Sequence, residues 1–297
     1  MRKFLILIII KFTFNNTYSQ NRIVVLDSLN HKPIPFVNIS FGKNNGLYTD
    51  ENGYFEINKN SNDTLNISHI SYNSYTIKSS EIKDTIILSQ NAILLKEVVV
   101  SNKKRISKYI DFPKKNNNFS SWPVSPKSEI VTLIIPNLEN TNSILKNFTF
   151  NFVKKKEKNS NITSQTAVRI NLYTADKNQN IKKHIYSSQV IYINPNKKEK
   201  LELDVEQEEI LLTKNGLFLG LEVIGDIDGS GNILKEKSFV HITLTDNNID
   251  DYSSKSYIKY VFDRKLNLTN INDIIKNTSG KAVNRSMSFG MTIYKPD

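Results

Sequence analysis

An oxygen-rich turn at residues 225–233 is the strongest candidate for chemistry in the sequence. It reads G-D-I-D-G-S-G-N-I and places oxygen groups at Asp226, Asp228, Ser230 and Asn232. The first half of a calcium-binding loop supplies oxygen ligands at this spacing and bends sharply at a glycine. The twelfth position of such a loop should be a bidentate glutamate, but here it is Lys237. A calcium site and a glycine-rich turn between strands both stay open, and the turn is favoured because aspartate and glycine are ordinary turn formers.

Other reactive side chains do not form a catalytic motif. A zinc carboxypeptidase needs a His-x-x-Glu pair, and none of the four histidines has a glutamate three residues later. The G-x-S-x-G nucleophile elbow is missing as well. Asp50 and Glu51 are neighbours in a turn, where adjacent side chains point apart, so Asp50 is expected to bond nearby backbone amides. The sequence therefore predicts a protein that is not an enzyme. A hydrolase whose Ser-His-Asp triad comes from distant positions is the alternative.

Residues 1–19 have the three parts of an export signal. Arg2 and Lys3 form a positive start, an apolar run follows at residues 4–10, and T-Y-S at residues 17–19 is a small-x-small cleavage site. Lys11 interrupts the apolar run, which is too short for a membrane span of about 20 residues. We expect an exported chain, periplasmic or at the outer surface, with no transmembrane span in its mature form. The alternative is a cytoplasmic chain that begins with an apolar strand.

Alternating apolar residues predict β-strands in the first third of the chain. Val37, Ile39 and Phe41 alternate with polar residues, and the pattern resumes with Phe55 after a turn at residues 50–53. Gly53 can take the positive φ of a tight connection, so residues 48–55 are expected to form a hairpin. About seven short strands with turns every 8 to 12 residues predict a β-sandwich.

Four motifs in this third carry a family resemblance. They are D-S-L-N-H-K-P-I-P-F-V-N-I from Asp27, T-D-E-N-G-Y-F from Thr49, L-N-I-S-H-I-S-Y from Leu65 and L-K-E-V-V-V from Leu95. In this order they resemble the carboxypeptidase-regulatory-like domain. The motif residues of the turn are Thr49, Asp50, Gly53, Tyr54 and Phe55.

The resemblance has implications for fold and role. It implies a transthyretin-like β-sandwich at residues 20–100, and a non-catalytic accessory module, because the family carries no peptidase chemistry of its own. Such domains are abundant in exported proteins of Bacteroidetes-type bacteria, often at the front of TonB-dependent receptors. The chain lacks the length for a receptor's large barrel after residue 100, so a different architecture is expected to follow.

The rest of the chain divides into a linker and a second domain. Residues 101–128 mix lysines with asparagines and prolines, and we interpret this basic stretch as a solvated linker; an exported protein rarely meets nucleic acid, so no nucleic-acid partner is predicted. Trp122 is expected to pack between the domains rather than to form an exposed platform. From residue 129 the strand signals return, and residues 217–224 are apolar on nearly every position, as in a central strand. About nine strands predict a jelly-roll-like sandwich at residues 129–297, with one helical turn allowed at residues 205–212 and a loop or short helix at residues 267–279.

Together these patterns predict an all-β protein of two β-sandwich domains. Its expected function is non-catalytic binding or scaffolding in the cell envelope, as an accessory to outer-membrane uptake, with an envelope protein or a glycan as partner. No cofactor is expected besides calcium at the turn of residues 225–233. The first alternative is a carbohydrate-binding module in which exposed Tyr173, Tyr186 or Tyr192 stack on sugar rings. The second is the hydrolase with a hidden triad, and the oligomeric state stays open.

Overall fold

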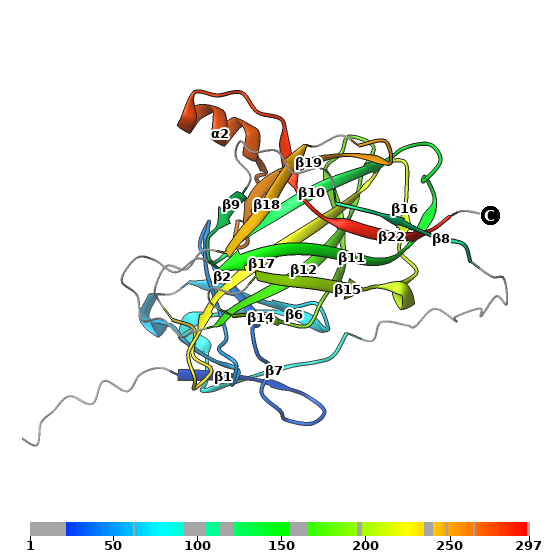
Figure 1. Ribbon diagram of the computed structural model, residues 1–297. Coiled ribbons are helices and arrows are strands. Elements are labelled where there is room, and N and C mark those ends of the chain that lie inside the picture. The colour runs from blue at the N-terminus through cyan, green and yellow to red at the C-terminus, as the bar shows by residue number, and fades with distance from the viewer. Residues whose placement is uncertain are drawn as a thin grey trace, which may run out of the picture.

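The computed structural model describes the chain except residues 1–21, 62, 92–104, 113–120, 155–164, 195–197, 235–239, 247–248, 264 and 296–297. The predicted export signal at residues 1–19 lies outside the described residues. Nearly all secondary structure of the described part consists of strands, which are arranged in four sheets and confirm the all-β prediction (Figure 1).

Two small sheets form the N-terminal sandwich. One has the order β4 (Tyr54–Glu56), β1 (Arg22–Asp27), β7 (Thr85–Leu88), and the other the order β3 (Asn45–Tyr48), β2 (Asn38–Phe41), β5 (Thr64–His69), β6 (Tyr72–Lys78). The alternating apolar residues face each other across the two sheets and are buried, among them Ile23, Ile39, Phe55 and Leu65. The period-two pattern of the sequence thus becomes the core of this domain.

The turn at residues 50–53 differs from the expected hairpin. β3 pairs with β2 in the four-stranded sheet, whereas β4 pairs with β1 in the three-stranded sheet, so the turn carries the chain from one sheet to the other. Gly53 does adopt positive φ (77°), as expected of a tight connection. The hairpin in this region is instead formed by β2 and β3, with its turn at residues 42–44. Turn chemistry in the sequence located the bend but not the sheet to which each flanking strand belongs.

Two large antiparallel sheets form the second sandwich. The seven-stranded sheet contains β13 (Ile181–Ser187), β12 (Gln165–Ala175), β17 (Leu217–Ile227), β10 (Ser128–Pro136), β19 (Tyr252–Tyr260) and β20 (Thr269–Asn270) in this order, and β14 (Ile191–Ile193) also pairs with β12. The eight-stranded sheet has the order β21 (Arg285–Met287), β18 (Val240–Asp246), β11 (Ser143–Lys154), β22 (Gly290–Tyr294), β8 (Ser107–Ile110), with β15 (Lys198–Asp204) and β16 (Leu211–Leu212) on β11 and β9 (Ser121–Val124) on β18. The chain passes repeatedly from one sheet to the other, as in jelly-roll sandwiches. Their facing apolar side chains form the largest core of the molecule.

The expected linker, residues 101–128, is partly incorporated into this second sandwich. β8 pairs with β22 and β9 pairs with β18, so the sandwich begins well before residue 129. Trp122 lies on β9 and packs against the core of the second sandwich, not between the domains as expected. Its neighbour Pro123 fits an edge strand, where one side of the backbone makes no ladder bonds. The prolines and lysines of this stretch concealed two short strands.

Helical structure is limited to short segments in the described residues. α2 (Ile271–Ser279) begins after Asn270, whose side chain accepts a hydrogen bond from the Asn272 amide, and ends at Gly280. The short 3-10 turns are η1 (Lys59–Ser61), η2 (Ser79–Glu81) and η3 (Glu206–Glu208). The helix and η3 confirm the two helical segments expected from the sequence. None of the described helices has the length and hydropathy to cross a membrane.

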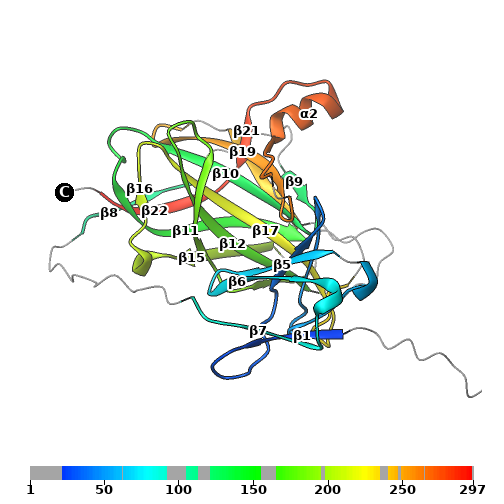
Figure 2. The same ribbon diagram turned by 180° about the vertical axis from the view of Figure 1, so that it is seen from behind.

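The N-terminal sandwich packs on the outer face of the seven-stranded sheet, the face turned away from the large core (Figures 1 and 2). Phe36 and Tyr48 of the first domain share an apolar cluster with Ala167, Ile224 and Phe262 of the second. Tyr48 and Phe262 have ring centroids 5.0 Å apart. The two sandwiches are therefore joined by a buried contact rather than by the chain alone.

Candidate functional site: a buried charge network between the sandwiches

Four charged residues form a row across the outer face of the seven-stranded sheet. Arg169 lies opposite Glu222, Glu222 opposite Glu129, and Glu129 opposite Lys259, on the neighbouring strands β12, β17, β10 and β19. The signs along the row are positive, negative, negative and positive. Each of the four residues is at most 7% exposed. Buried charges destabilise a protein unless they are paired and hydrogen-bonded, so the effect of this row on stability depends on its contacts.

Each carboxylate has a cation and further hydrogen-bond donors. Lys259 Nζ lies 2.6 Å from Glu129 Oε2, and Arg169 lies 3.6 Å from Glu222 Oε1. Asn171 bridges the carboxylates, because its Nδ2 donates to Glu129 Oε1 at 3.1 Å and to Glu222 Oε2 at 2.8 Å. The Tyr173 hydroxyl donates to Glu129 and accepts from Lys259 Nζ at 3.1 Å. A Cβ at Gly220 would lie 1.9 Å from Glu129 Oε1, so only glycine leaves room for this carboxylate.

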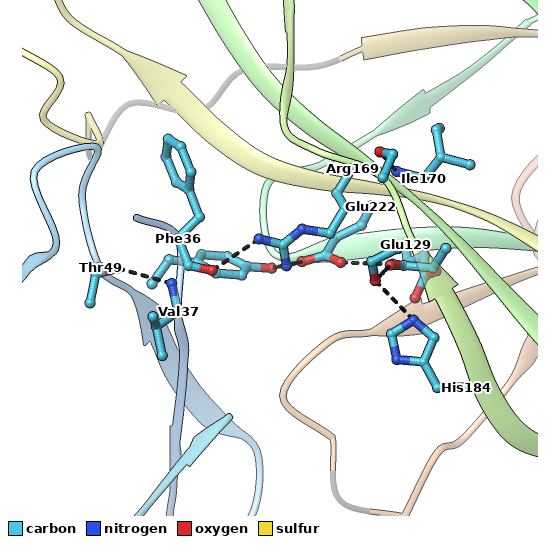
Figure 3. Close-up of polar contacts among 12 residues, drawn as sticks. Phe36, Val37, Thr49, Glu129, Arg169, Ile170, His184 and Glu222 are labelled. Atoms are coloured by element: carbon cyan, nitrogen blue, oxygen red, sulfur yellow. Dashed lines mark hydrogen bonds and ion pairs between the residues drawn. The ribbon is translucent and has the colours of Figure 1, made fainter. Parts of the chain in front are cut away.

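The N-terminal domain completes the network, as Figure 3 shows. The Tyr48 hydroxyl donates to Glu222 Oε1 at 2.8 Å, and Arg169 donates to the backbone carbonyl of Phe36 at 3.0 Å. Phe36 has a left-handed backbone conformation with φ of 54°. The Thr49 hydroxyl fixes the adjoining segment, because it accepts from the Val37 amide and donates to the Ile34 carbonyl. Thr49, a motif residue of the sequence, thus supports the loop that reaches Arg169.

The environment shifts the pKa of three groups in the network, Glu222, Tyr48 and Tyr173. Burial alone would raise the pKa of Glu222, but the positive charge of Arg169 and the hydrogen bonds from Asn171 and Tyr48 outweigh it and lower this pKa. Burial and the charge of Glu222 raise the pKa of Tyr48 well above its usual range. Burial and the charge of Glu129 do the same for Tyr173. At neutral pH the Glu222 carboxyl is therefore ionised, and the Tyr48 and Tyr173 hydroxyls keep their hydrogens.

A serine and a histidine lie at the edge of the network. Ser187 Oγ lies 3.0 Å from His184 Nε2, and the His184 ring stacks on Tyr173 with centroids 4.7 Å apart. Ser187 donates its hydroxyl hydrogen to Asn171 Oδ1 at 2.6 Å. That hydrogen is not shared with the imidazole, so in this geometry His184 does not act as a base toward Ser187. Burial lowers the pKa of His184, so its ring is neutral at pH 7.

The predicted calcium residues form a closed turn. Asp226 lies at the end of β17, is 1% exposed and accepts from the Thr166 hydroxyl at 2.5 Å. Asp228 Oδ1 accepts from the backbone amides of Ser230 and Asn232 at 2.8 and 2.9 Å. The Asp228 contacts are those of an Asx turn, in which an aspartate side chain bonds the backbone of its own turn. Among the described residues, no group of three or more His, Cys, Asp or Glu side chains is placed to hold a metal ion.

The two turns singled out in the sequence touch each other. The Glu51 amide donates to the Gly231 carbonyl at 3.0 Å, and Asn52 Nδ2 donates to the Ser230 carbonyl at 3.0 Å. Tyr192 adds a hydrogen bond to Glu51 Oε1 at 2.7 Å. Both turns thus contribute to the joint between the domains.

The motif residues near this joint have structural contacts. Asp50 Oδ1 accepts from the amides of Asn52 and Tyr54 at 2.9 and 2.8 Å, which confirms that Asp50 bonds nearby backbone. Phe55 is buried in the core of the N-terminal sandwich, and the guanidinium of Arg22 lies 4.1 Å from the centre of the Tyr54 ring.

The tyrosines of the carbohydrate-binding alternative make contacts within the protein instead of facing solvent. Tyr173 is 7% exposed and belongs to the charge network, and Tyr192 bonds to the N-terminal domain. Tyr186 packs partly buried against the core of the second sandwich. These three side chains therefore do not form the exposed platform that the carbohydrate-binding alternative required.

The charged row itself was missed by sequence reasoning, although one signal was present. Glu222 interrupts the apolar run of residues 217–224, which forms most of β17. A charge at such a position requires a buried partner, because a lone buried charge is strongly destabilising. Arg169 and Lys259 alternate with apolar residues and so resembled ordinary solvent-facing positions.

The fold and the site define an all-β protein in which a small β-sandwich is docked on a larger one through a buried charge network. Residues 24–100 match the family model of the CarboxypepD_reg-like domain. The match confirms the resemblance found in the sequence. Among curated proteins, none matches the chain.

Comparison with solved structures gives distant likenesses only. The chain is similar to a clostridial cysteine protease, Cwp84 after propeptide cleavage, with 12% identity and a TM-score of 0.34, over 88% of this chain and 66% of that one. It is also similar to infectious bursal disease virus, Gx strain, with 8% identity and a TM-score of 0.28 over 95% and 58% of the two chains. The Gt strain of the virus gives 9% identity and a TM-score of 0.26 over 88% and 55%. The chain spans less than two thirds of each of these chains, and scores this low carry no argument about fold or activity.

Proposed function

We propose that this protein is a non-catalytic binding or scaffolding protein of the cell envelope, exported and accessory to outer-membrane uptake. The observation that carries the proposal is that the residues best suited to catalysis are buried and paired with one another. Glu129, Glu222, Arg169 and Lys259 neutralise one another in a buried row. The network links two domains, and it lowers the pKa of Glu222 and raises those of Tyr48 and Tyr173.

Catalysis would demand the opposite arrangement. A general acid or base works best with a pKa near the operating pH and with access to substrate. Here the pKa of Glu222 is lowered, that of Tyr173 is raised, and both side chains are nearly inaccessible. Ser187 donates to Asn171 rather than to an imidazole. These features support a structural role for the network.

The catalytic part of the proposal is tested on the purified full-length chain. Chromogenic ester, peptide and glycoside probes should give the same rates with the native chain, with a Ser187→Ala variant and with buffer alone. Turnover by the native chain that Ser187→Ala abolishes would contradict the proposal.

The location is tested by cell fractionation and N-terminal sequencing. The motif of residues 1–19 supports a mature chain that begins at Gln20 and is recovered outside the cytoplasm. Recovery of the uncleaved chain from the cytoplasm would contradict export.

Calcium is not needed for this role, and we propose that the turn of residues 225–233 is held by its own hydrogen bonds. Asp228 Oδ1 is already bonded to two backbone amides, which supports this interpretation. Titration with millimolar calcium should release no heat and leave the melting temperature unchanged. A saturable calorimetric signal that Asp228→Asn removes would establish the calcium site instead.

A further inference from the structure

The outer face of the eight-stranded sheet carries a polar patch around one exposed aromatic ring. Tyr109 on β8, Thr292 on β22, Asn147 on β11 and Asp204 on β15 lie opposite one another on neighbouring strands. Two residues further along the same strands come Asp111, Gly290 and Glu202, with Asp111 just after the end of β8. The four strands run side by side in Figure 1.

The alternation of each strand shows that this face points away from the core. Ile110, Met291, Phe148 and Leu203 separate the two rows and are buried in the core of the second sandwich. Their neighbours in each strand must therefore face outward. Glu202 and Asp204 are exposed, and Tyr109 is 55% exposed.

Tyr109 is positioned across the sheet rather than free in solvent. A Cβ at Gly290 would lie 3.1 Å from the Tyr109 hydroxyl oxygen and 3.3 Å from the Phe112 ring, so the missing side chain at Gly290 leaves the space into which Tyr109 reaches. The Tyr109 hydroxyl donates to Asp111 Oδ1 at 3.2 Å. A tethered ring costs little conformational entropy when a ligand covers it.

Polar groups lie on the strands beside this ring. Asn147 Nδ2 donates to Glu202 Oε1 at 2.9 Å, which orients the carboxylate across the sheet. Burial raises the pKa of Tyr109, and the charges of Asp111 and Glu202 raise it further, which indicates that both carboxylates act on the phenol. The patch therefore combines an apolar ring face with acceptors at its edges.

This composition selects among ligand classes. Three carboxylates, on Asp111, Glu202 and Asp204, disfavour phosphate or another anion, although the whole chain has a formal charge of +11. The polar rows offer too little apolar surface for the hydrophobic centre of a stable protein interface. A neutral sugar fits, because one side of a pyranose presents C–H groups to an aromatic ring while its hydroxyls donate to carboxylates.

We propose that this surface, made of Tyr109, Asp111, Asn147, Glu202, Gly290 and Thr292 and called here the Tyr109 patch, binds a neutral oligosaccharide. The ring of Tyr109 stacks on one sugar, and Glu202 and Asp111 accept its hydroxyl hydrogens. The inference rests on the proposed binding role and places it at a surface distinct from the interdomain network.

The experiment is affinity electrophoresis of the full-length chain in gels that contain one soluble polysaccharide each: hydroxyethyl cellulose, xylan, galactomannan, amylopectin, laminarin or, as an anionic probe, polygalacturonate. At least one neutral polysaccharide should retard the native chain. Tyr109→Ala should weaken the retardation about tenfold or more, as expected for loss of a stacking ring. Tyr109→Phe should keep most of the affinity, and Glu202→Gln should reduce it without removing a ring.

Matched controls keep the result interpretable. Tyr75→Ala removes another exposed tyrosine, 42% exposed on β6 of the N-terminal domain, and should leave the retardation unchanged. Equal melting temperatures show that the variants are folded, and Glu202→Gln tests the patch even if Tyr109→Ala is unstable. Retardation by no neutral polysaccharide, by polygalacturonate alone, or equally in Tyr109→Ala and Glu202→Gln would overturn the inference.

The same gels separate this inference from the proposed function. Release of reducing ends from a retarding polysaccharide would contradict the non-catalytic role and leave the binding site standing. Absence of both binding and turnover would remove the Tyr109 patch and leave the non-catalytic role standing.

Discussion

The hydrogen bond between Tyr48 and Glu222 gives the sharpest test of the joint between the sandwiches. It spans 2.8 Å, and its two residues are 5% and 3% exposed. Tyr48→Phe removes only the hydroxyl and leaves the ring against Phe262. The carboxylate then loses one donor in a place that water does not reach.

The expected cost follows from the partners that remain. A hydrogen bond to a charged group contributes about 1.5–3 kcal/mol to stability. Glu222 keeps the 2.8 Å bond from Asn171 and the longer contact with Arg169, so it is not left unpaired. We therefore expect a loss of about 2 kcal/mol in the free energy of unfolding, near the middle of that range. In a Glu222→Gln background the same change should cost about 1 kcal/mol, because the acceptor is then neutral.

The single tryptophan makes the assay specific. Trp122 packs against the core of the second sandwich, whereas Tyr48 belongs to the first. Urea unfolding followed by Trp122 fluorescence should shift to a lower midpoint in Tyr48→Phe with an unchanged slope. Tyr75→Phe, in the same domain but 42% exposed, should leave the midpoint unchanged and serves as the control.

The reasoning is refuted if the Trp122 transition of Tyr48→Phe coincides with that of the native chain. That outcome would mean that the two sandwiches unfold independently and that the Tyr48–Glu222 bond adds nothing to the stability of the second sandwich. A shift of equal size in Tyr75→Phe would also refute it, because the effect would then not depend on the buried contact.

Three further perturbations test other parts of the structure. Burial lowers the pKa of His69 from 6.5 to about 4, so its contribution to stability is complete above the unfolded pKa and is lost as the pH falls from 6.5 towards 4. Between pH 6.5 and 5 the free energy of unfolding from urea titration should fall by roughly 2 kcal/mol more in the native chain than in His69→Gln. An equal fall in both would argue against this effect of burial. Lys259→Met strands the fully buried carboxylate of Glu129 and should cost about 3–5 kcal/mol by thermal melting, with recovery when Glu129 is also made Met. Gly46→Ala places a Cβ 2.1 Å from the Phe262 ring and should cost about 1–3 kcal/mol in urea, much of which Phe262→Leu should restore; an additive double variant would speak against the clash.

Much of the fold could be predicted because strand periodicity is a local property of the sequence. Alternating residues such as Val168, Ile170 and Leu172 do lie in the large core, and the apolar run at residues 217–224 is the central strand β17. The motifs of the first third identified their domain correctly. Each of these signals depends only on neighbouring residues.

The rest could not be predicted because it depends on which faces meet. Period-two alternation assigns Arg169 to the face opposite the core, but it cannot show that a second domain covers that face. The turn of residues 50–53 was recognised as a bend, yet its hydrogen bonds to Gly231 and Ser230 join segments about 180 positions apart. Tyr173 and Tyr192 resembled exposed rings for the same reason. Long-range contacts, not local propensity, decided all of these positions.

The order of signs in the charged row affects how the two halves come together. A linear array of plus, minus, minus, plus has no net charge and little net dipole, so its field decays within a short distance. Long-range attraction therefore adds little to the encounter of the small sandwich with the large one, and the connecting chain keeps them close enough to meet. Once the two domains are docked, the charged row is shielded from dissolved ions. The stability of the contact between the domains should therefore depend little on ionic strength.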